Sequence, residues 1–431
     1  MHGIVLSQLQ KLTEIRRSYI KEIKNAEKDR ENFSSAPLFI YRWMFCFVWG
    51  EIDRTIAEKS GQFGQQPSQY PIRQSDITMY TDGKQLNHQL FSDIEKAKHY
   101  VHINFFSIAD DKVSHQFLEL LRKKSQEGVE VYYALDRLGG ILLKKKEREL
   151  LVKKGVHFTY YNKPAFPYLF SSLDHRNHRR ISVIDGKIGY IGGFNIGKKY
   201  LGEKEKLGYW RDYHLQIRGE GVQDLEHQFV LDWKKNSEKP IPIHNAVKEK
   251  GAISHRFTAY YSGEKLGQDY AMLFQQAKES IIILTPYFIP KDKTIWKALV
   301  DARKRGVHVK ILFSPHSDAL LVKEAAYPYI RKALTQGIEV YGYKNGVLHG
   351  KVFLIDKKVL MVGTVNFDSR SFHLNEEMNC YIQDPIYISK IKPVIDEDLQ
   401  NSKRVTSSDV NQLSIKEKMK EKVAKIFEYY L

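Results

Sequence analysis

HRRISVID at residues 178–185 and HGKVFLID at residues 349–356 are two copies of one eight-residue pattern. Each copy reads His, any residue, a fixed cation (Arg180 or Lys351), four mostly apolar residues and Asp. Each is followed by a similar run, IGYIGGFN or VLMVGTVN, whose final Asn lies 17 positions after the His. Because this spacing is kept across an offset of 171 residues, the sequence predicts a structural duplication.

The predicted elements around the two strings follow the same order in both halves. A helical spacing at 111–128 leads to a strand at 129–136, and the spacing at 293–306 leads to a strand at 307–314. Both helical stretches end at a Gly that suits a C-cap. The sequence therefore predicts an α/β protein of two duplicated α/β sandwich halves, packed about a pseudo-twofold axis with one shared active site.

Composition divides the 431 residues into four predicted segments: 1–75, 76–250, 251–400 and 401–431. The two middle segments hold the repeats. The first is a polar helix followed by an apolar stretch at 36–50 and a linker rich in Gln, Ser, Gly and Pro. The apolar stretch has 15 residues, interrupted by Arg42, which is short for a transmembrane helix. It is predicted either to lie in a membrane interface or to form a buried helix.

The last segment is predicted to be an amphipathic helix. Apolar residues recur at helical spacing, and Lys fills the other face; they are Ile415, Met419, Val423, Ile426 and Tyr430. Two placements fit this pattern, a terminal helix docked on the protein and a helix lying on a membrane surface.

The charge of the chain indicates an anionic partner. The formal net charge is +17 and the pI is near 9.4, which suits a phospholipid surface or a nucleic acid. The two cysteines, Cys46 and Cys380, lie far apart and show no metal-ligand spacing, so neither a disulfide framework nor a zinc site is predicted. No metal and no cofactor are predicted for the site. The oligomeric state stays open.

The repeated strings carry the residue types that phosphoryl transfer requires. In an extended strand, residues two apart share a face, so His178 lies beside Arg180 and His349 beside Lys351. Imidazole can attack phosphorus or protonate a leaving oxygen, and the cation stabilises charge on the other phosphate oxygens. Two such pairs together would supply a nucleophile, a general acid and a cationic cradle without a metal.

Six further residues complete the predicted site. They are the string-ending Asp185 and Asp356, the run-ending Asn195 and Asn366, and the acids Asp212 and Glu377 that follow along each repeat. The string-ending acids fall on the opposite strand face, which favours a supporting role in the catalytic set. The later acids are predicted to orient the imidazoles and, with the two Asn, to serve the substrate phosphate. The neighbouring His175, Arg176 and Arg179 fit a solvated basic face or a phosphate-gathering rim equally well.

The strings resemble the HxKxxxxD signature of the phospholipase D superfamily. NHRRISVIDGKIGYIGGFNIGKKYLG and WRDYHLQIRGEGV are similar to the first half of bacterial cardiolipin synthases, and TPYFIP, LHGKVFLID and GTVNFDSRSFHLNEEMN to the second. The resemblance runs from about Tyr80 to Asn401, and RSFxLNxE at 370–377 is its most specific part.

The resemblance implies transfer of a phosphatidyl group from one phosphatidylglycerol to another, through a phosphohistidine and with release of glycerol. It implies His178 as nucleophile and His349 as general acid, an order that the residues themselves leave open. It also implies an anionic phospholipid membrane as partner, in place of nucleic acid, and a bacterial cell membrane to which the chain binds peripherally or through an interface anchor.

Two departures from the family pattern keep alternatives open. Arg180 stands where the family usually has Lys, and where the family commonly begins with hydrophobic transmembrane segments this chain offers only the apolar stretch at 36–50. The alternatives are a phospholipase D that uses water as acceptor, a nuclease of the same superfamily, and a lipid-binding protein without catalysis.

Overall fold

The computed structural model describes residues 66–428, apart from 167–168, 243–248, 262–264, 317–318 and 320. All of them belong to one compact unit, Ala57–Leu431. The apolar stretch at 36–50 and Tyr430 lie outside the described residues. Within the described part, no helix has the length and apolar character needed to span a membrane.

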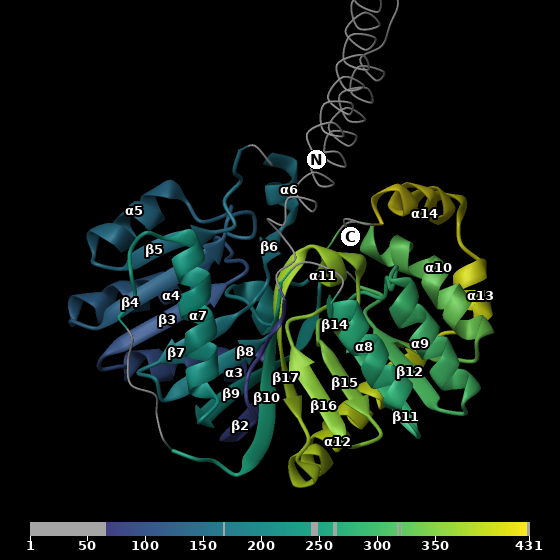
Figure 1. The fold of residues 1–431 in the computed structure, drawn as a ribbon. Coiled ribbons are helices and arrows are strands. Elements are labelled where there is room, and N and C mark those ends of the chain that lie inside the picture. The colour runs from purple at the N-terminus through teal and green to yellow at the C-terminus, as the bar shows by residue number, and fades with distance from the viewer. Residues whose placement is uncertain are drawn as a thin grey trace, which may run out of the picture. The chain divides into compact units, whose positions relative to one another are not determined.

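The two halves contain sheets with the same strand order (Figure 1). In each, three parallel strands are followed by four that pair antiparallel. The first half runs β5 (His157–Tyr161), β4 (Glu130–Asp136), β3 (Tyr100–Phe105), β7 (Ile181–Ile184), β8 (Ile188–Gly192), β9 (Tyr209–Gly219) and β2 (Arg73–Asp82). The second runs β13 (Glu339–Tyr343), β12 (His308–Phe313), β11 (Ser280–Thr285), β15 (Val352–Ile355), β16 (Val359–Gly363), β17 (Asn375–Ile382) and β10 (Ile253–Tyr260). Two short strands extend the second sheet, β1 (Ser68–Gln69) beside β10 and β18 (Ser402–Arg404) beside β13.

Helices cover both faces of each sheet. Along β3, Val101 and Ile103 face the core under one layer of helices, while Tyr100 belongs to the core on the other face. The first half has α3 (Gly83–Glu95), α4 (Lys112–Gln126) and α5 (Lys145–Lys153) on one face and α7 (Val222–Asn236) on the other. The second half has α8 (Lys265–Gln276), α9 (Lys293–Lys304) and α10 (Val322–Thr335) on one face and α12 (Pro385–Gln400) on the other. The predicted duplicated α/β fold is confirmed.

The strand registers between the halves reveal the pseudo-twofold axis. Strands β2 and β10 pair antiparallel, with Ser75 opposite Ile253, equivalent positions in the two repeats. On either side of this pair, β14 (Gly346–Leu348) of the second half runs parallel to β9, and β6 (Arg176–Asn177) of the first half runs parallel to β17. Each His string therefore begins beside a strand of the other half, and one core made of both inner sheet faces joins the halves.

The C-terminal helix docks with its apolar side outward. After α13 (Ser407–Asn411), α14 (Ile415–Phe427) packs on α10, where Glu421 pairs with Arg331 and Ala424 is fully buried. The apolar residues that the sequence marked are instead largely exposed: Ile415, Met419, Val423 and Ile426 have exposed fractions of 81, 64, 44 and 58%. The helix is thus docked, as one alternative held, but its apolar stripe remains accessible.

Candidate active site

The first histidine lies in a buried polar pocket between β6 and β7. The Nδ1 atom of His178 is 2.8 and 3.0 Å from the two carboxylate oxygens of Glu377. Its other ring nitrogen, Nε2, is 2.7 Å from Nη2 of Arg180, and the edge of the Phe106 ring packs against the imidazole. Because Nδ1 is held by a carboxylate, Nε2 is the nitrogen available to a phosphorus atom.

The second histidine repeats this arrangement on β14 and β15. The Nδ1 atom of His349 is 2.5 Å from Oδ2 of Asp212, and Nζ of Lys351 lies 2.8 Å from Nδ1 and 3.1 Å from Nε2 of the same ring. The Trp210 ring packs against this imidazole, with centroids 5.1 Å apart. Both imidazoles therefore present an Nε2 atom with a cation beside it, the arrangement that phosphate oxygens would need.

The orienting acids are exchanged between the halves. Glu377 of the second repeat holds His178 of the first, and Asp212 of the first repeat holds His349 of the second. The exchange follows from the parallel pairs β6–β17 and β14–β9, which also bond the backbone N–H of each His to a carbonyl of the other half, Glu376 or Arg211. The sequence predicted the four residues, and the structure adds which acid serves which histidine.

The two His–carboxylate pairs differ in how burial and nearby charges shift the pKa of their acids. Burial lowers the pKa of His178 well below its usual range, and the positive charges of Arg180 and Lys351 lower it further. Burial raises the pKa of Glu377 to about 7, against the hydrogen bond from Thr364 and the charge of Arg180. Burial also opposes ionisation of Asp212, but the charges of Lys351 and His349 outweigh it, and the pKa of Asp212 is lowered.

The string-ending acids lie outside this group. Asp185 accepts backbone N–H bonds from Lys98, His99 and Tyr100 at the start of β3. Asp356 accepts the equivalent three bonds at the start of β11. Both adopt left-handed backbone angles, φ 51° and 52°, in the hairpin turn that follows the His strand. These contacts agree with the supporting role that the residue pattern favoured, and a direct catalytic role for the two acids stays a prediction.

The two asparagines are buried at equivalent positions near the histidines. Oδ1 of Asn195 accepts the backbone N–H of Ser107, which fixes its amide. Oδ1 of Asn366 has no hydrogen-bond partner and is buried. An unsatisfied buried amide oxygen is costly in a folded protein, which suits a group that meets a ligand.

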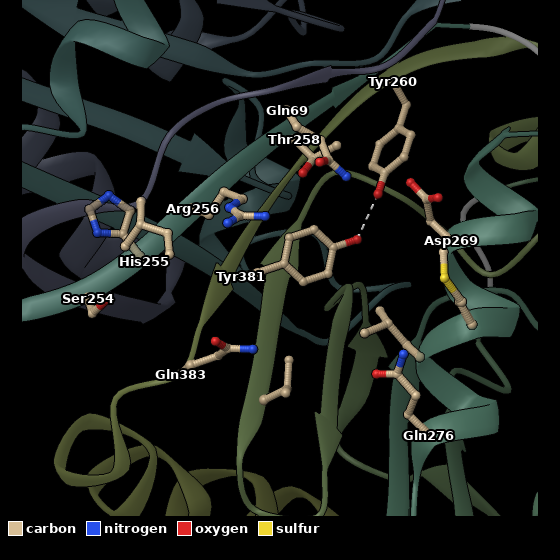
Figure 2. A pocket seen from close by; sticks show the side chains of 14 residues that line it. Gln69, Ser254, His255, Arg256, Thr258, Tyr260, Asp269, Gln276, Tyr381 and Gln383 are labelled. Atoms are coloured by element: carbon tan, nitrogen blue, oxygen red, sulfur yellow. Dashed lines mark hydrogen bonds between the residues drawn. The ribbon is translucent and has the colours of Figure 1, made fainter.

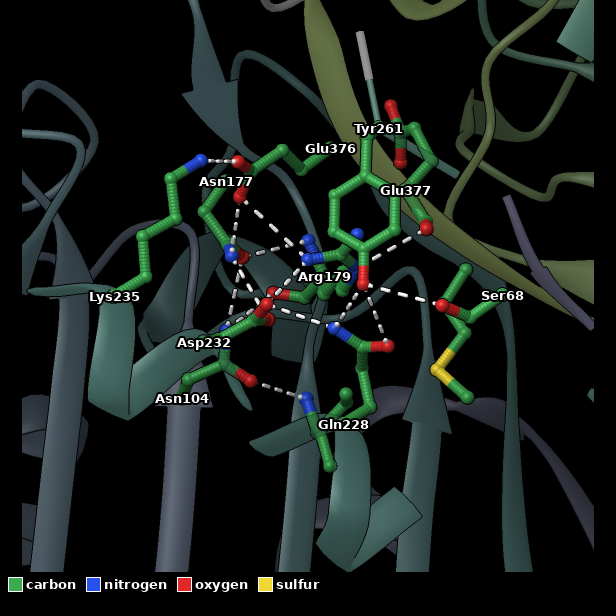
Figure 3. Close-up of polar contacts among 12 residues, drawn as sticks. Ser68, Asn104, Asn177, Arg179, Gln228, Asp232, Lys235, Tyr261, Glu376 and Glu377 are labelled. Atoms are coloured by element: carbon green, nitrogen blue, oxygen red, sulfur yellow. Dashed lines mark hydrogen bonds and ion pairs between the residues drawn. The ribbon is translucent and has the colours of Figure 1, made fainter. Parts of the chain in front are cut away.

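The basic residues beside the first string form a buried framework, so neither alternative from the sequence holds for them. Arg179 donates to Asp232 at 2.6 Å and to the Tyr260 carbonyl, and its guanidinium lies 3.5 Å from Glu376 (Figure 3). Arg176 pairs with Asp136, and Nδ1 of His175 bonds the Ser171 carbonyl. These contacts tie the first string to α7 and β17 and hold the neighbouring His178 in place.

Sequence reasoning missed the groups that surround Glu377. Thr364, Ser371 and Asn375 all donate side-chain hydrogen bonds to its carboxylate. All three fall in GTVNFDSRSFHLNEEMN, so the specificity of that string was the available signal. Ser371 lies on the one-turn helix α11 (Ser369–His373).

Two cavities flank the sheets. One of about 440 Å³ is lined mainly by residues of the β3–α4 loop and of the 3-10 helix η1 (Lys198–Leu201). The other, about 310 Å³, lies between β10, β17 and α8, where the Tyr260 and Tyr381 hydroxyls bond each other (Figure 2). Among the described residues, no three His, Cys, Asp or Glu side chains are grouped to hold a metal ion.

Duplicated sheets that meet at two crossed His–carboxylate pairs define a phospholipase D-like protein. The family model described as "Cardiolipin synthase, PLD-like domain" matches residues 90–233 and 270–399. The chain belongs to this cardiolipin synthase family, as the sequence predicted.

Individual proteins with similar sequences are also named as cardiolipin synthases. The chain is 41% identical over 362 residues to "Minor cardiolipin synthase ClsB" of Bacillus subtilis, covering 83% of this chain and 90% of that one. It is 36% identical to "Cardiolipin synthase 2" of Staphylococcus epidermidis, covering 82% and 74%. Among solved structures, phosphatidylserine synthase of Haemophilus influenzae shares the fold, with a TM-score of 0.64 at 16% identity over 84% of this chain and 97% of that one.

Proposed function

We propose that this chain is a phosphatidyltransferase that makes cardiolipin from two molecules of phosphatidylglycerol. The observation that carries the proposal is the pair of crossed His–carboxylate contacts, each with a cation beside Nε2, in a chain of the cardiolipin synthase family. Such a site supplies two proton-handling imidazoles and two fixed positive charges for one phosphate group.

In the first step, Nε2 of His178 attacks the phosphorus of phosphatidylglycerol. The bond from phosphorus to the glycerol oxygen breaks, and His349 gives its Nε2 proton to that oxygen, so glycerol leaves neutral. Arg180 and Lys351 balance the charge on the remaining phosphate oxygens. In the second step a hydroxyl of another phosphatidylglycerol gives its proton to His349 and attacks the phosphorus, and the bond to His178 breaks.

The electrostatics of the two pairs support this order of roles. A nucleophile needs a free lone pair, and the pKa of His178 is lowered, so its imidazole is neutral. A general acid needs a stabilised imidazolium, and the carboxylate of Asp212, whose pKa is lowered, faces Nδ1 of His349. Asn366, with its unpartnered Oδ1, and Asn195 are proposed to contact the substrate at the rim of the site.

Lipid analysis tests the proposal directly. Purified chain with phosphatidylglycerol labelled at phosphorus should yield cardiolipin and free glycerol in equal amounts. Because the P–N bond is labile in acid, the enzyme is quenched with detergent at alkaline pH, and it should then carry label on the peptide that contains His178. Phosphatidic acid as the sole lipid product would establish the hydrolase in its place. Label on the His349 peptide would reverse the two roles, and cleavage of plasmid DNA would favour the nuclease.

We propose further that the chain binds peripherally to an anionic bacterial membrane through α14. Its exposed apolar stripe is flanked by lysines, which suits an anionic lipid interface. Met419→Asp should release the protein from vesicles that contain phosphatidylglycerol, whereas Met272→Asp, on the exposed side of α8, should not. If Met419→Asp instead changes only the oligomeric state, the stripe contacts a second copy and the membrane assignment fails. If Met419→Asp changes neither vesicle binding nor the oligomeric state, the assignment fails as well.

A further inference from the structure

The 440 Å³ cavity at η1 and the β3–α4 loop has three lysines in its lining. Lys198, Lys199 and Lys204 come from η1 and the turn after it. Two acids also line the cavity, but both have other partners: Asp111 accepts the backbone N–H groups of Ser114 and Lys198, and Glu203 lies 3.8 Å from Lys84. The cavity is therefore positively charged on balance and suits an anionic group.

A hydrogen bond connects this cavity to one of the predicted site residues of the first repeat. Ser107 lines the cavity and donates its backbone N–H to Asn195, and its hydroxyl is 3.1 Å from the Tyr200 hydroxyl. The cavity is thus joined through Ser107 to Asn195, one of the two asparagines proposed to contact the substrate.

A chain of contacts connects the cavity to the second imidazole. Nζ of Lys199 lies 4.8 Å from the Tyr200 ring centroid and 5.3 Å from that of Trp210. The Trp210 ring packs against His349. An anion held near Lys199 would therefore be one aromatic ring away from the proposed general acid.

The pseudo-twofold symmetry gives Lys199 a counterpart. Lys199 follows Asn195 by four residues, and Arg370 follows Asn366 by four residues. The charge of Arg370 acts on His178, and its guanidinium donates to the Asp174 carbonyl of the first half. The duplication has kept a cation on each side of the site, one toward His178 and one toward His349.

We propose that the lysine-lined cavity binds the phosphate of the acceptor phosphatidylglycerol, with Lys199 as its main contact. The inference rests on the proposed function and deepens it. Phosphatidylglycerol carries its reacting hydroxyl and its own phosphate on one three-carbon bridge, so a phosphate held near Lys199 places the hydroxyl near His349. That hydroxyl forms the new P–O bond, the P–Nε2 bond of His178 breaks, and the proton passes to Nε2 of His349. The cavity selects phosphatidylglycerol over water and simple alcohols as acceptor.

The test compares two acceptors with the same donor. Lys199→Met keeps the side-chain length and removes the charge, and Lys187→Met, in the exposed β7–β8 turn, is the matched control. Each variant receives detergent-dispersed phosphatidylglycerol with and without excess 1,3-propanediol, a neutral acceptor. We expect Lys199→Met to make cardiolipin roughly ten- to a hundredfold more slowly, through a higher KM for the acceptor. Transfer to propanediol should stay within about twofold of wild type, and Lys199→Arg should restore cardiolipin formation.

The neutral acceptor separates the possible failures. Equal loss with both acceptors would mean that Lys199 acts through Trp210 and His349 or through folding, and would overturn the subsite. Unchanged cardiolipin formation would overturn it too. If wild type transfers to propanediol but never to phosphatidylglycerol, both the subsite and the proposed cardiolipin synthesis fail. If wild type transfers to neither acceptor, the proposed function fails at the chemistry itself.

Discussion

The two halves of the site share a backbone and differ in electrostatics. At His178 the partner acid Glu377 is surrounded by neutral donors, and burial raises its pKa to about 7. At His349 the partner acid Asp212 faces the cation Lys351, and its pKa is lowered. The duplicated scaffold thus holds its two imidazoles in different electrostatic surroundings, which suits the proposed division into nucleophile and general acid.

The largest expected effect comes from removing either imidazole and changing the leaving group. Both His178→Ala and His349→Ala should lower turnover of phosphatidylglycerol by roughly 10⁴-fold or more. A phosphatidyl ester of p-nitrophenol needs no proton for its leaving group, so His349→Ala should still release a burst of p-nitrophenolate and His178→Ala should not. Stopped-flow absorbance measures the burst. The opposite pattern would assign the nucleophile to His349.

The next effect compares the two acids. Asp212→Asn should lower kcat by about 10²- to 10⁴-fold, because an amide neither stabilises an imidazolium nor fixes its tautomer. Glu377→Gln should cost less, since the neutral form of Glu377 is already populated near pH 7. Steady-state cardiolipin formation at pH 7 gives both ratios. Equal losses would show that the electrostatic difference between the halves has no part in catalysis.

Glu377 should also make the free energy of unfolding depend on pH. The pKa of Glu377 in the folded protein, about 7, exceeds the usual 4.5 of a Glu in the unfolded chain. Between pH 4.5 and 7 the folded state therefore binds a proton that the unfolded state has lost. The free energy of unfolding of wild type then falls as the pH rises through this range. Above pH 7 the loss reaches about 3 kcal/mol. The free energy of unfolding of Glu377→Gln, relative to wild type, should therefore rise from pH 4.5 to 7.5 in urea titrations. A difference that stays constant with pH would place the Glu377 pKa near its usual value.

The sequence predicted which residues make up the two halves of the site, but it did not predict which acid pairs with which histidine. Period-two spacing put His178 with Arg180 and His349 with Lys351, because neighbours on one strand face are local. The exchange of Asp212 and Glu377 depends on strand pairs between halves, which no local pattern encodes. The basic run next to His178 was misread for the same reason, since the acids that bury it, such as Asp232, lie far along the chain.

The smallest expected effect comes from exchanging the two cations beside the histidines, which are Arg180 in the first repeat and Lys351 in the second. Arg180 bonds both Nε2 and the carbonyl of His178, so its guanidinium holds the ring in place. Arg180→Lys keeps the charge but supplies one nitrogen for these two contacts, and kcat should fall by at most about tenfold. Lys351→Arg, which must fit a larger group beside His349, is the matched exchange and should cost more. Cardiolipin formation by the two variants measures the difference. If Arg180→Lys raised turnover from undetectable to clear, Arg180 would mark a lipid-binding protein that has lost catalysis.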